Sequence, residues 1–475
     1  MRSVSLRQIA GATGGTIEGP VRLNVSSVGT DTRDMADRDL FIALKGERFD
    51  GHTFLADAAR SGAKAALVAR GNPHLDEFRL AHGGFPLVVV KDTLRAMGEL
   101  AAFVREGLDI TSVGITGTTG KTNTKDYLVA ALGAKCRVAA SPGSYNNEVG
   151  IPLTIFEIKK ADRAFIAEMG ARHSGDIKRL AEIVKPSFGI ITNVGPGHLE
   201  LFKTEDAVAR TKAELAKALP PAGAIVLNAD DHWSRTIARQ TRARVARFGF
   251  RRGADYRAKR IELDSMGRPA FELNGPGFTE KVKLPGTGRH QVANALAAAA
   301  CAHLMGVEPE DIASGLSRAS LSGWRMEVVE SNGFLVINDS YNANPDSMDA
   351  ALETLKAVGS GRRTIAVLGR MAELGAGSRS YHEEAGRRVA ALDIDLLVTV
   401  GRGARYYAGA ALAGGMPRGS VFRCDSADDA AFLLGDLVEP EDVILIKASR
   451  VVGLESLSAK LQDPGFTPVK LVANV

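Results

Sequence analysis

The sequence predicts an α/β protein with three domains: a small α/β N-terminal domain, a central domain with a P-loop-type, mostly parallel sheet, and a C-terminal Rossmann-like α/β domain. The first observation is length, because 475 residues are too many for one hydrophobic core. The second is pattern: short apolar runs alternate with helical segments, which is typical of parallel sheets covered by helices. The third is a glycine-rich stretch at 114–124 that leaves one apolar run and enters a helix.

Residues 1–108 are expected to form the first domain, in which apolar runs at 40–44, 65–69 and 86–90 predict strands. Residues 109–326 are expected to form the second. Its strands are predicted at 110–116, 164–169, 188–194 and 224–228. A helix is predicted to begin at Lys121 and to end at Gly133, since glycine commonly ends helices.

Residues 327–475 repeat the alternation and are expected to form the third domain. The apolar runs lie at 334–339, 364–369, 396–401 and 442–447. Met348, Leu352 and Leu355 mark one face of a predicted helix between the first two runs. Ligands of such folds bind at the carboxyl ends of the strands, so the polar loops after these runs are candidate binding residues.

Composition narrows the function classes. The formal charge of +5 comes from 60 basic and 55 acidic residues spread along the chain, which suits anionic small ligands and does not indicate a nucleic-acid partner. Three distant cysteines predict neither a disulfide framework nor a cysteine zinc site. The sequence shows no signal peptide and no apolar run long enough for membrane insertion. We therefore expect a cytoplasmic protein, and a monomer.

The stretch GITGTTGKTNT (114–124) predicts a phosphate-binding loop. Gly117 and Gly120 allow backbone N–H groups to turn inward, Lys121 supplies a positive charge, and the Thr122 hydroxyl can bind Mg²⁺ at a helix N-terminus. The strict pattern GxxxxGK[ST] is not met, because its first glycine would fall on Ile115. A glycine-rich turn that binds nothing is the alternative interpretation, and the flanking strand and helix favour nucleotide. The candidate residues are Gly117, Thr118, Thr119, Gly120, Lys121, Thr122 and Asn123.

This loop, with its first glycine at 117, resembles that of the Mur ligase family, which assembles the peptide of bacterial cell-wall precursors and includes folylpolyglutamate synthase among its relatives. Further segments agree with this resemblance in all three sections of the chain. They are DTRDMADRDLFIALKGERFDGH (31–52), SYNNEVGIPLT (144–154), EMGARHSGDI (168–177), DSYNANPDSM (339–348) and VLGRMAELG (367–375). They are similar to the members that add D-alanyl-D-alanine to a UDP-N-acetylmuramoyl tripeptide.

The resemblance implies ATP as the phosphoryl donor and two Mg²⁺ ions. It assigns Glu168 and Thr122 to one metal and His198 to the second, with Asn193 close by. It also implies that Lys212 is carbamylated, which would turn an ammonium into an anionic metal ligand. Taken alone, Glu168 is a capping or solvent-facing acid, His198 a packing residue and Lys212 a solvated lysine.

The remaining candidate residues are also implied by the resemblance. His290 and Asn294, one helical turn apart, would contact the nucleotide, and Arg325 its phosphates. The residues implied at the closing active site are Asp339, Tyr341, Asn342 and Asn344. Those implied for the uridine diphosphate end and the adjoining sugar or peptide are Asp31, Thr32, Arg33, Lys45, Gly46, Asp50, His52, Asn146 and Asn147. Among the first-domain residues, plain turn chemistry is the alternative.

The sequence departs from the family pattern at five positions: Gln291 for Asn, Trp324 for Gly, Asn338 for Asp, Arg370 for Asp and Ala448 for Gly. These departures put the local backbone at Trp324, and the hydrogen bonding around the others, in question. The resemblance implies a ligase with Lys121, His198, Lys212, Arg325 and Asp339 in catalytic roles. Two alternatives stay open: another ligase of this family, adding the third residue or of the folylpolyglutamate type, and a P-loop ATPase or regulator without ligase activity.

Overall fold

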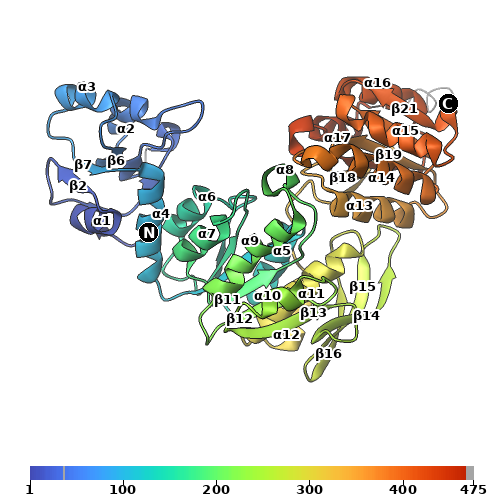
Figure 1. Cartoon of the computed structure of the whole chain (residues 1–475), viewed down its shortest axis with the longest axis horizontal. Coiled ribbons are helices and arrows are strands. Elements are labelled where there is room, and N and C mark those ends of the chain that lie inside the picture. Colours follow the sequence, from blue (N-terminus) through green and yellow to red (C-terminus); the bar gives the residue numbers. More distant parts are fainter. Residues whose placement is uncertain (36–37, 467–475) are drawn as a thin grey trace.

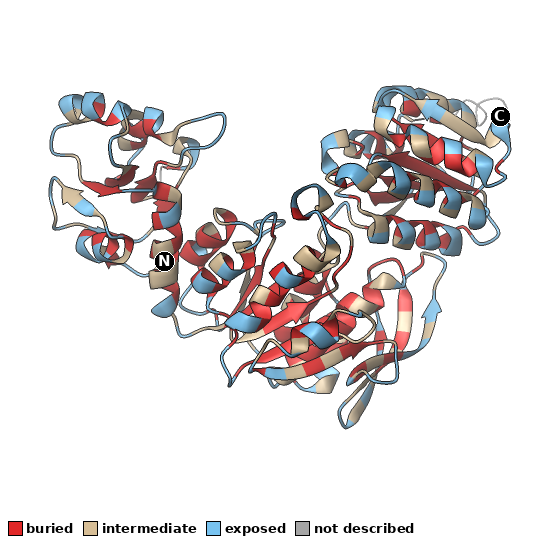
Figure 2. Cartoon of the chain, in the orientation of Figure 1, coloured by how far each residue is buried: buried red, intermediate tan, exposed pale blue. Residues whose placement is uncertain are grey.

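The computed structural model describes residues 1–35 and 38–466. Three large sheets succeed one another along the described chain. Figure 1 shows the units built on them in an open arc, with the N-terminal and C-terminal units on either side of the central one. Figure 2 shows buried residues concentrated on the strands and inner helix faces of each unit. The prediction of a mixed α/β protein with largely parallel sheets is confirmed.

The N-terminal unit has a five-stranded sheet in the order β2-β7-β6-β5-β4, in which only β2 is antiparallel to its neighbour. Its strands are β2 (Thr16–Glu18), β4 (Val28–Gly29), β5 (Leu40–Ile42), β6 (Ala65–Ala69) and β7 (Leu87–Val90). Strands β1 (Val4–Ser5) and β3 (Asn24–Val25) pair separately. The helices are α1 (Leu6–Thr13), α2 (Leu55–Arg60), α3 (His74–Ala81) and α4 (Thr93–Glu106).

The central unit has a nine-stranded sheet in the order β16-β15-β14-β13-β12-β11-β8-β10-β9. Its parallel strands are β8 (Thr111–Thr116), β9 (Val138–Ala140), β10 (Ala164–Glu168), β11 (Phe188–Ile191), β12 (Ala224–Asn228), β13 (Arg244–Gly249) and the start of β14 (Tyr256–Leu263). Strands β15 (Pro269–Gly275) and β16 (Phe278–Lys283) add an antiparallel edge that the sequence pattern did not predict.

Helices cover both faces of the central sheet. One buried cluster joins the sheet to α5 (Lys121–Leu132), α11 (His290–Leu304) and α12 (Pro309–Ser317). Another joins the opposite face to α6 (Gly150–Glu157), α7 (Asp176–Val184) and α9 (Glu205–Ala218), and it continues into α4. Two short helices, α8 (Leu199–Phe202) and α10 (Ser234–Ala238), complete the unit. Helix α5 ends at Leu132 as predicted, although Gly133 has an ordinary φ of −59°.

The C-terminal unit has a six-stranded sheet in the order β17-β18-β22-β19-β20-β21, parallel except for β17. Its strands are β17 (Glu327–Ser331), β18 (Phe334–Asp339), β19 (Thr364–Gly369), β20 (Leu396–Val400), β21 (Val421–Cys424) and β22 (Val443–Lys447). Its helices are α13 (Pro345–Val358), α14 (Ser378–Ala391), α15 (Arg405–Ala413), α16 (Ala427–Leu437) and α17 (Glu455–Gln462). No helix in the described part of the chain is long and apolar enough to cross a membrane.

Candidate active site

A cavity of about 820 Å³ lies between the central and C-terminal units. Its central wall is built from the loop between β8 and α5 and from residues that follow β10 and β11, and its C-terminal wall from residues that follow β18. The predicted site residues that line it are Thr118, Thr119, Gly120, Lys121, Thr122, Asn123, Asn146, Asn147, Glu168, His198, Lys212, His290, Asn294, Arg325, Asp339, Tyr341, Asn342 and Asn344. Predicted site residues that are far apart in the sequence are therefore brought to one space.

The predicted phosphate loop has the strand–loop–helix geometry expected of it. Gly120 has a φ of 77°, in the left-handed region that disfavours side chains, and a Cβ there would overlap the Asn294 side chain. Gly117 has a φ of 151°, and a Cβ there would overlap Thr192. Asn193, which follows β11, fixes the loop conformation, because its Oδ1 accepts hydrogen bonds from the backbone N–H groups of Thr118 (3.1 Å) and Thr119 (2.9 Å). Both glycines are thus required by close contacts.

Lys121 folds back over this loop. Its Nζ donates hydrogen bonds to the carbonyl oxygens of Gly117 (2.9 Å) and Thr118 (3.2 Å). Burial lowers the pKa of the Lys121 ammonium; the Glu168 carboxylate opposes this shift and the Arg325 guanidinium adds to it. Lys121 and Arg325, from opposite sides of the cavity, therefore repel each other in this structure, and an anion between them would relieve the repulsion.

Glu168 ends strand β10, and 2% of its surface is exposed. Its Oε2 accepts a hydrogen bond of 2.7 Å from the Thr122 hydroxyl, and its Oε1 accepts one of 2.9 Å from the Asn146 amide. Asn147 has a structural task, because its Oδ1 accepts from the N–H groups of Val149 and Gly150 at the start of α6. Glu168 and Thr122 are therefore hydrogen-bonded to each other where the phosphate loop enters α5.

His198 and Lys212 lie on the same wall. The Nδ1 of His198 is 2.6 Å from the Glu373 carboxylate of the C-terminal unit, and burial lowers the pKa of His198. Lys212, on α9, has 3% of its surface exposed, and burial together with the charge of Lys121 lowers its pKa to about 7. In the described part of the chain, no three His, Cys, Asp or Glu side chains are gathered as a metal site. A metal here would need hydroxyl, phosphate or modified-lysine oxygens as further ligands.

His290 and Asn294 lie on the first turns of α11 and both line the cavity. His290 Nδ1 is buried without a hydrogen-bond partner, and burial lowers the pKa of this ring to about 4. Asn294 Nδ2 donates a hydrogen bond of 3.2 Å to Gln291 Oε1. A neutral ring with an unpartnered nitrogen next to an amide is suited to the polar edge of a nucleotide base.

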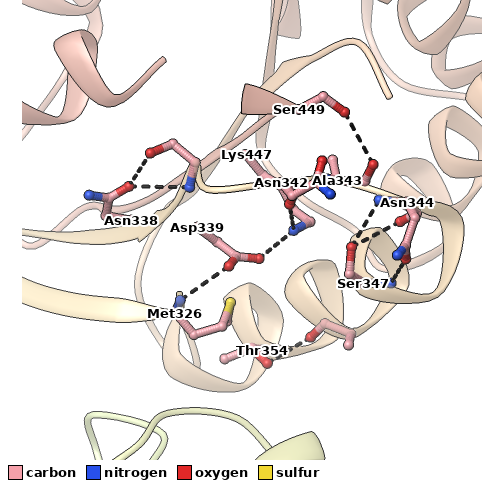
Figure 3. Close-up of polar contacts among 12 residues, drawn as sticks. Met326, Asn338, Asp339, Asn342, Ala343, Asn344, Ser347, Thr354, Lys447 and Ser449 are labelled. Atoms are coloured by element: carbon pink, nitrogen blue, oxygen red, sulfur yellow. Dashed lines mark hydrogen bonds and ion pairs between the residues drawn. The ribbon is translucent and has the colours of Figure 1, made fainter. Parts of the chain in front are cut away.

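The C-terminal wall centres on a buried ion pair (Figure 3). Lys447 Nζ donates a 2.5 Å hydrogen bond to Asp339 Oδ2 and one of 3.0 Å to the Asn342 carbonyl oxygen. The other oxygen of Asp339 accepts from the Met326 N–H at 3.2 Å. Both oxygens of Asp339 are therefore engaged within the protein. Asn344 caps α13, accepting from the Ser347 N–H at 2.9 Å.

The departures from the family pattern have visible consequences. Asn338 Oδ1 accepts from the Ser340 hydroxyl at 2.7 Å, so its amide oxygen is satisfied locally (Figure 3). The Arg370 side chain is exposed, and Ala448 is fully buried against Gly369. Trp324 has a φ of 60°, a backbone conformation that glycine adopts far more easily.

The predicted first-domain residues do not line this cavity. Asp31 and Arg33 pair with each other, with Arg33 Nε 2.9 Å from Asp31 Oδ1, and Thr32 begins the short helix beside them. His52 is buried: its Nδ1 lies 2.6 Å from Asp50 Oδ1, and its Nε2 accepts from the Ala69 N–H at 2.8 Å. Lys45 forms a backbone bridge with Asp50, and Gly46 closes the same loop by donating to the Phe49 carbonyl.

Sequence reasoning missed two residues at this site. Glu373 joins the two walls, since its carboxylate contacts His198 and also accepts from Arg172 Nη2 at 2.9 Å. Lys447 was not predicted as the ion-pair partner of Asp339. Glu373 lies in the segment 367–375, one of those similar to the Mur ligase family. An acidic residue in that segment was therefore the feature of the sequence that could have marked it as a site residue.

Comparison with known proteins gives the class. Three family models match: "Mur ligase family, catalytic domain" over residues 24–105, "Mur ligase middle domain" over 115–302 and "Mur ligase, glutamate ligase domain" over 324–450. The chain belongs to the Mur ligase family.

Particular relatives are similar over nearly the whole chain. The UDP-N-acetylmuramoyl-tripeptide--D-alanyl-D-alanine ligase of Mycobacterium tuberculosis is 38% identical, covering 97% of this chain and 98% of the relative. The Escherichia coli protein of the same name is 34% identical, covering 98% and 100%. A crystal structure of MurF from Acinetobacter baumannii is 32% identical with a TM-score of 0.87, covering 97% and 99%. MurF from Thermotoga maritima in complex with ADP is 28% identical with a TM-score of 0.80, covering 92% and 97%.

Proposed function

We propose that this chain is an ATP-dependent ligase that joins D-alanyl-D-alanine to a UDP-N-acetylmuramoyl tripeptide in peptidoglycan precursor synthesis. The observation that carries the proposal is the shared cavity, in which the phosphate loop and Glu168 face the C-terminal residues Tyr341 and Asn342. The names and full-length similarity of the relatives support the choice of substrates.

The reaction has two chemical steps. The tripeptide carboxylate attacks the γ-phosphorus of ATP, and the bond between that phosphorus and the β–γ bridging oxygen breaks. The products of this step are ADP, which departs, and an acyl phosphate on the tripeptide. The amine of the dipeptide then attacks the acyl carbon, loses a proton, and inorganic phosphate departs. Two anions must meet in the first step, so positioning and charge neutralisation carry the catalysis.

The chain's own residues supply this positioning. We place the ATP phosphates on the loop from Gly117 to Thr122, where Lys121 can turn from the loop carbonyls to the phosphates. Arg325 approaches from the other wall, and we place the base against His290 and Asn294. The ADP complex of the Thermotoga maritima relative supports a nucleotide in this fold.

We propose Mg²⁺ ligands on the central wall. Thr122 and Glu168 fit one ion, because a hydroxyl and a carboxylate oxygen lie 2.7 Å apart at the end of the loop. His198, with Lys212, would hold a second ion. When bound, Mg²⁺ supplies positive charge between the ATP phosphates and the attacking carboxylate.

We propose that Lys212 is carbamylated. Carbamylation requires a neutral amine, and a pKa lowered to about 7 by burial leaves a large neutral fraction near neutral pH. Intact-mass and peptide mass spectrometry of protein kept under CO₂ should show one added CO₂ at Lys212. An unmodified Lys212 in fully active protein would contradict this assignment.

We propose that three successive parts of the chain bind different substrates. Residues 1–108 bind the uridine diphosphate end through Asp31, Thr32, Arg33, Lys45, Gly46, Asp50 and His52. Residues 109–326 bind ATP, with Asn146 and Asn147 next to the sugar or peptide, and residues 327–475 bind the dipeptide through Tyr341, Asn342 and Asn344, with Asp339 holding that wall. We further propose a monomer that acts in the cytoplasm.

The experiment that tests the function is phosphate release across combinations of substrates. Release that requires ATP, the nucleotide-linked tripeptide and D-alanyl-D-alanine together supports the proposal. Release with a single amino acid or a polyglutamate acceptor would indicate another ligase of the family. Steady release with ATP alone would indicate an ATPase without ligase activity.

A further inference from the structure

The segment 324–326, which leads from the central unit into β17, separates two cavities. Arg325 and Met326 line the site cavity described above and also a second cavity, of about 260 Å³, that is bounded by Met266 and Leu321. Met326 is anchored in the C-terminal hydrophobic core, with 5% of its surface exposed, whereas the half-buried Arg325 borders open space on two sides, so packing alone does not fix its side chain. Other interactions must therefore decide where the Arg325 side chain points.

The backbone of this segment is strained. Trp324 has a φ of 60° and Met326 a φ of 57°, both in the left-handed region that side chains disfavour. Hydrogen bonds tie it to the end of β18: the Tyr341 N–H donates to the Trp324 carbonyl at 3.2 Å, and the Met326 N–H donates to Asp339 at 3.2 Å. These bonds fix the backbone but not the side chains.

Two arginines and two aromatic rings fix the side chains. The Arg450 guanidinium carbon lies 4.6 Å from the centre of the Trp324 ring and 5.9 Å from that of the Tyr341 ring. The Arg325 guanidinium carbon lies 3.7 Å from the Tyr341 ring centre. Such cation–π contacts are favourable at these distances. We call these four residues the hinge stack.

We propose that Trp324 and Arg450 are positioning residues that hold the strained segment in place and keep Arg325 turned into the cavity. This inference rests on the proposed ATP site, in which Arg325 reaches the phosphates. A glycine at 324 would adopt the observed backbone without strain, but it would offer Arg450 no ring. Arg450 would then lose its contact with the segment, and Arg325 would keep only its stacking on Tyr341.

Substitutions in the hinge stack should weaken ATP binding without a matching loss of thermal stability. Trp324→Gly relieves strain, so its thermal midpoint should equal or exceed that of the wild type, while its Kd for ATP rises roughly tenfold through loss of the stack. Trp324→Phe keeps a ring and should stay within about twofold of the wild-type Kd. Arg450→Lys keeps the charge but loses the planar group, so its Kd should rise in the same direction as that of Trp324→Gly.

Arg405→Lys is the matched control, because Arg405 stacks on Tyr406 in the same unit, 4.9 Å from the ring centre, outside the cavity. It should leave the ATP affinity unchanged. An ATP Kd for Trp324→Gly equal to that of the wild type would overturn the proposal. So would equal losses of affinity in Trp324→Gly, Trp324→Phe and Arg405→Lys.

Fluorescence gives an independent readout, because the chain has two tryptophans. In a Trp233→Phe background, Trp324 is the sole tryptophan, and its emission should change on addition of ATP and respond to Arg450→Lys before ATP is added. No response to either would overturn the hinge stack. Wild-type protein that binds no ATP would instead refute the proposed function, so the two failures are distinguishable.

Discussion

The buried ion pair between Lys447 and Asp339 allows a stringent test of the C-terminal wall. The two residues are register partners on adjacent strands, β22 and β18, with 1% and 9% of their surfaces exposed. Replacing Lys447 by Met leaves the Asp339 carboxylate buried with only the Met326 N–H as a partner. Removing one member of a buried pair costs about 3–5 kcal/mol, and we expect about 3 kcal/mol because the cavity gives Asp339 some access to water.

The double variant Lys447→Met/Asp339→Asn removes both charges, so it should be more stable than Lys447→Met alone by about 1–2 kcal/mol. Because unfolding of a chain with three units need not be two-state, native-state hydrogen exchange on the amides of β18 and β22 is the suitable assay. A double variant that is less stable than Lys447→Met, or a Lys447→Met variant that loses less than about 1 kcal/mol, would refute the reasoning.

Three further predictions follow from the site. Glu168→Gln should lower the rate of phosphate release roughly 100-fold without changing the far-UV circular dichroism, and a smaller fall than about fivefold would argue against a metal or phosphate role. Gly120→Ala should weaken ATP binding at least tenfold in a calorimetric titration, because the added Cβ would overlap Asn294 and the backbone φ is 77°. Gly409→Ala is the control and should leave ATP binding unchanged, because a Cβ at this position on α15 meets open space. Asp346 is exposed overall, but partial loss of hydration where it lines the cavity, together with the charge of Glu205, raises the pKa of its carboxyl to about 6. Its ionisation therefore lowers stability as pH rises from about 4 to about 6. Asp346→Asn should therefore raise the thermal midpoint above pH 6 by an amount worth about 1 kcal/mol, after allowance for the exposed carboxyl, and leave it unchanged below pH 4.

Most of the parallel strands could be predicted from apolar runs alone, although β4, β9, β13 and β21 were not. The runs at 110–116, 164–169 and 188–194 became β8, β10 and β11, which lie side by side, so that Glu168 and the phosphate loop meet at one edge. The antiparallel edge was not predicted, because neither of its strands presents a continuous apolar run: β15 alternates between buried and partly buried residues, and β16 mostly between partly buried and exposed ones.

The contacts between units were beyond sequence reasoning. The pairing of Glu373 with His198 joins residues far apart in the chain and depends on how the two units sit, which no local pattern encodes. The substitution of Trp324 for the customary glycine was visible in the sequence, but the compensating stack with Arg450 was not. His52, which the resemblance assigns to the substrate, lies buried between Asp50 and Ala69, and its contact with substrate stays a prediction.

The acyl phosphate is the central claim, and oxygen transfer tests it most directly. The acceptor tripeptide is labelled with ¹⁸O in the carboxylate to be joined, and the phosphate released during turnover with ATP and D-alanyl-D-alanine is analysed by mass spectrometry. Attack of that carboxylate on the γ-phosphorus predicts one ¹⁸O atom in each phosphate released. Phosphate that carries no label, alongside normal formation of the amide product, would contradict the mechanism.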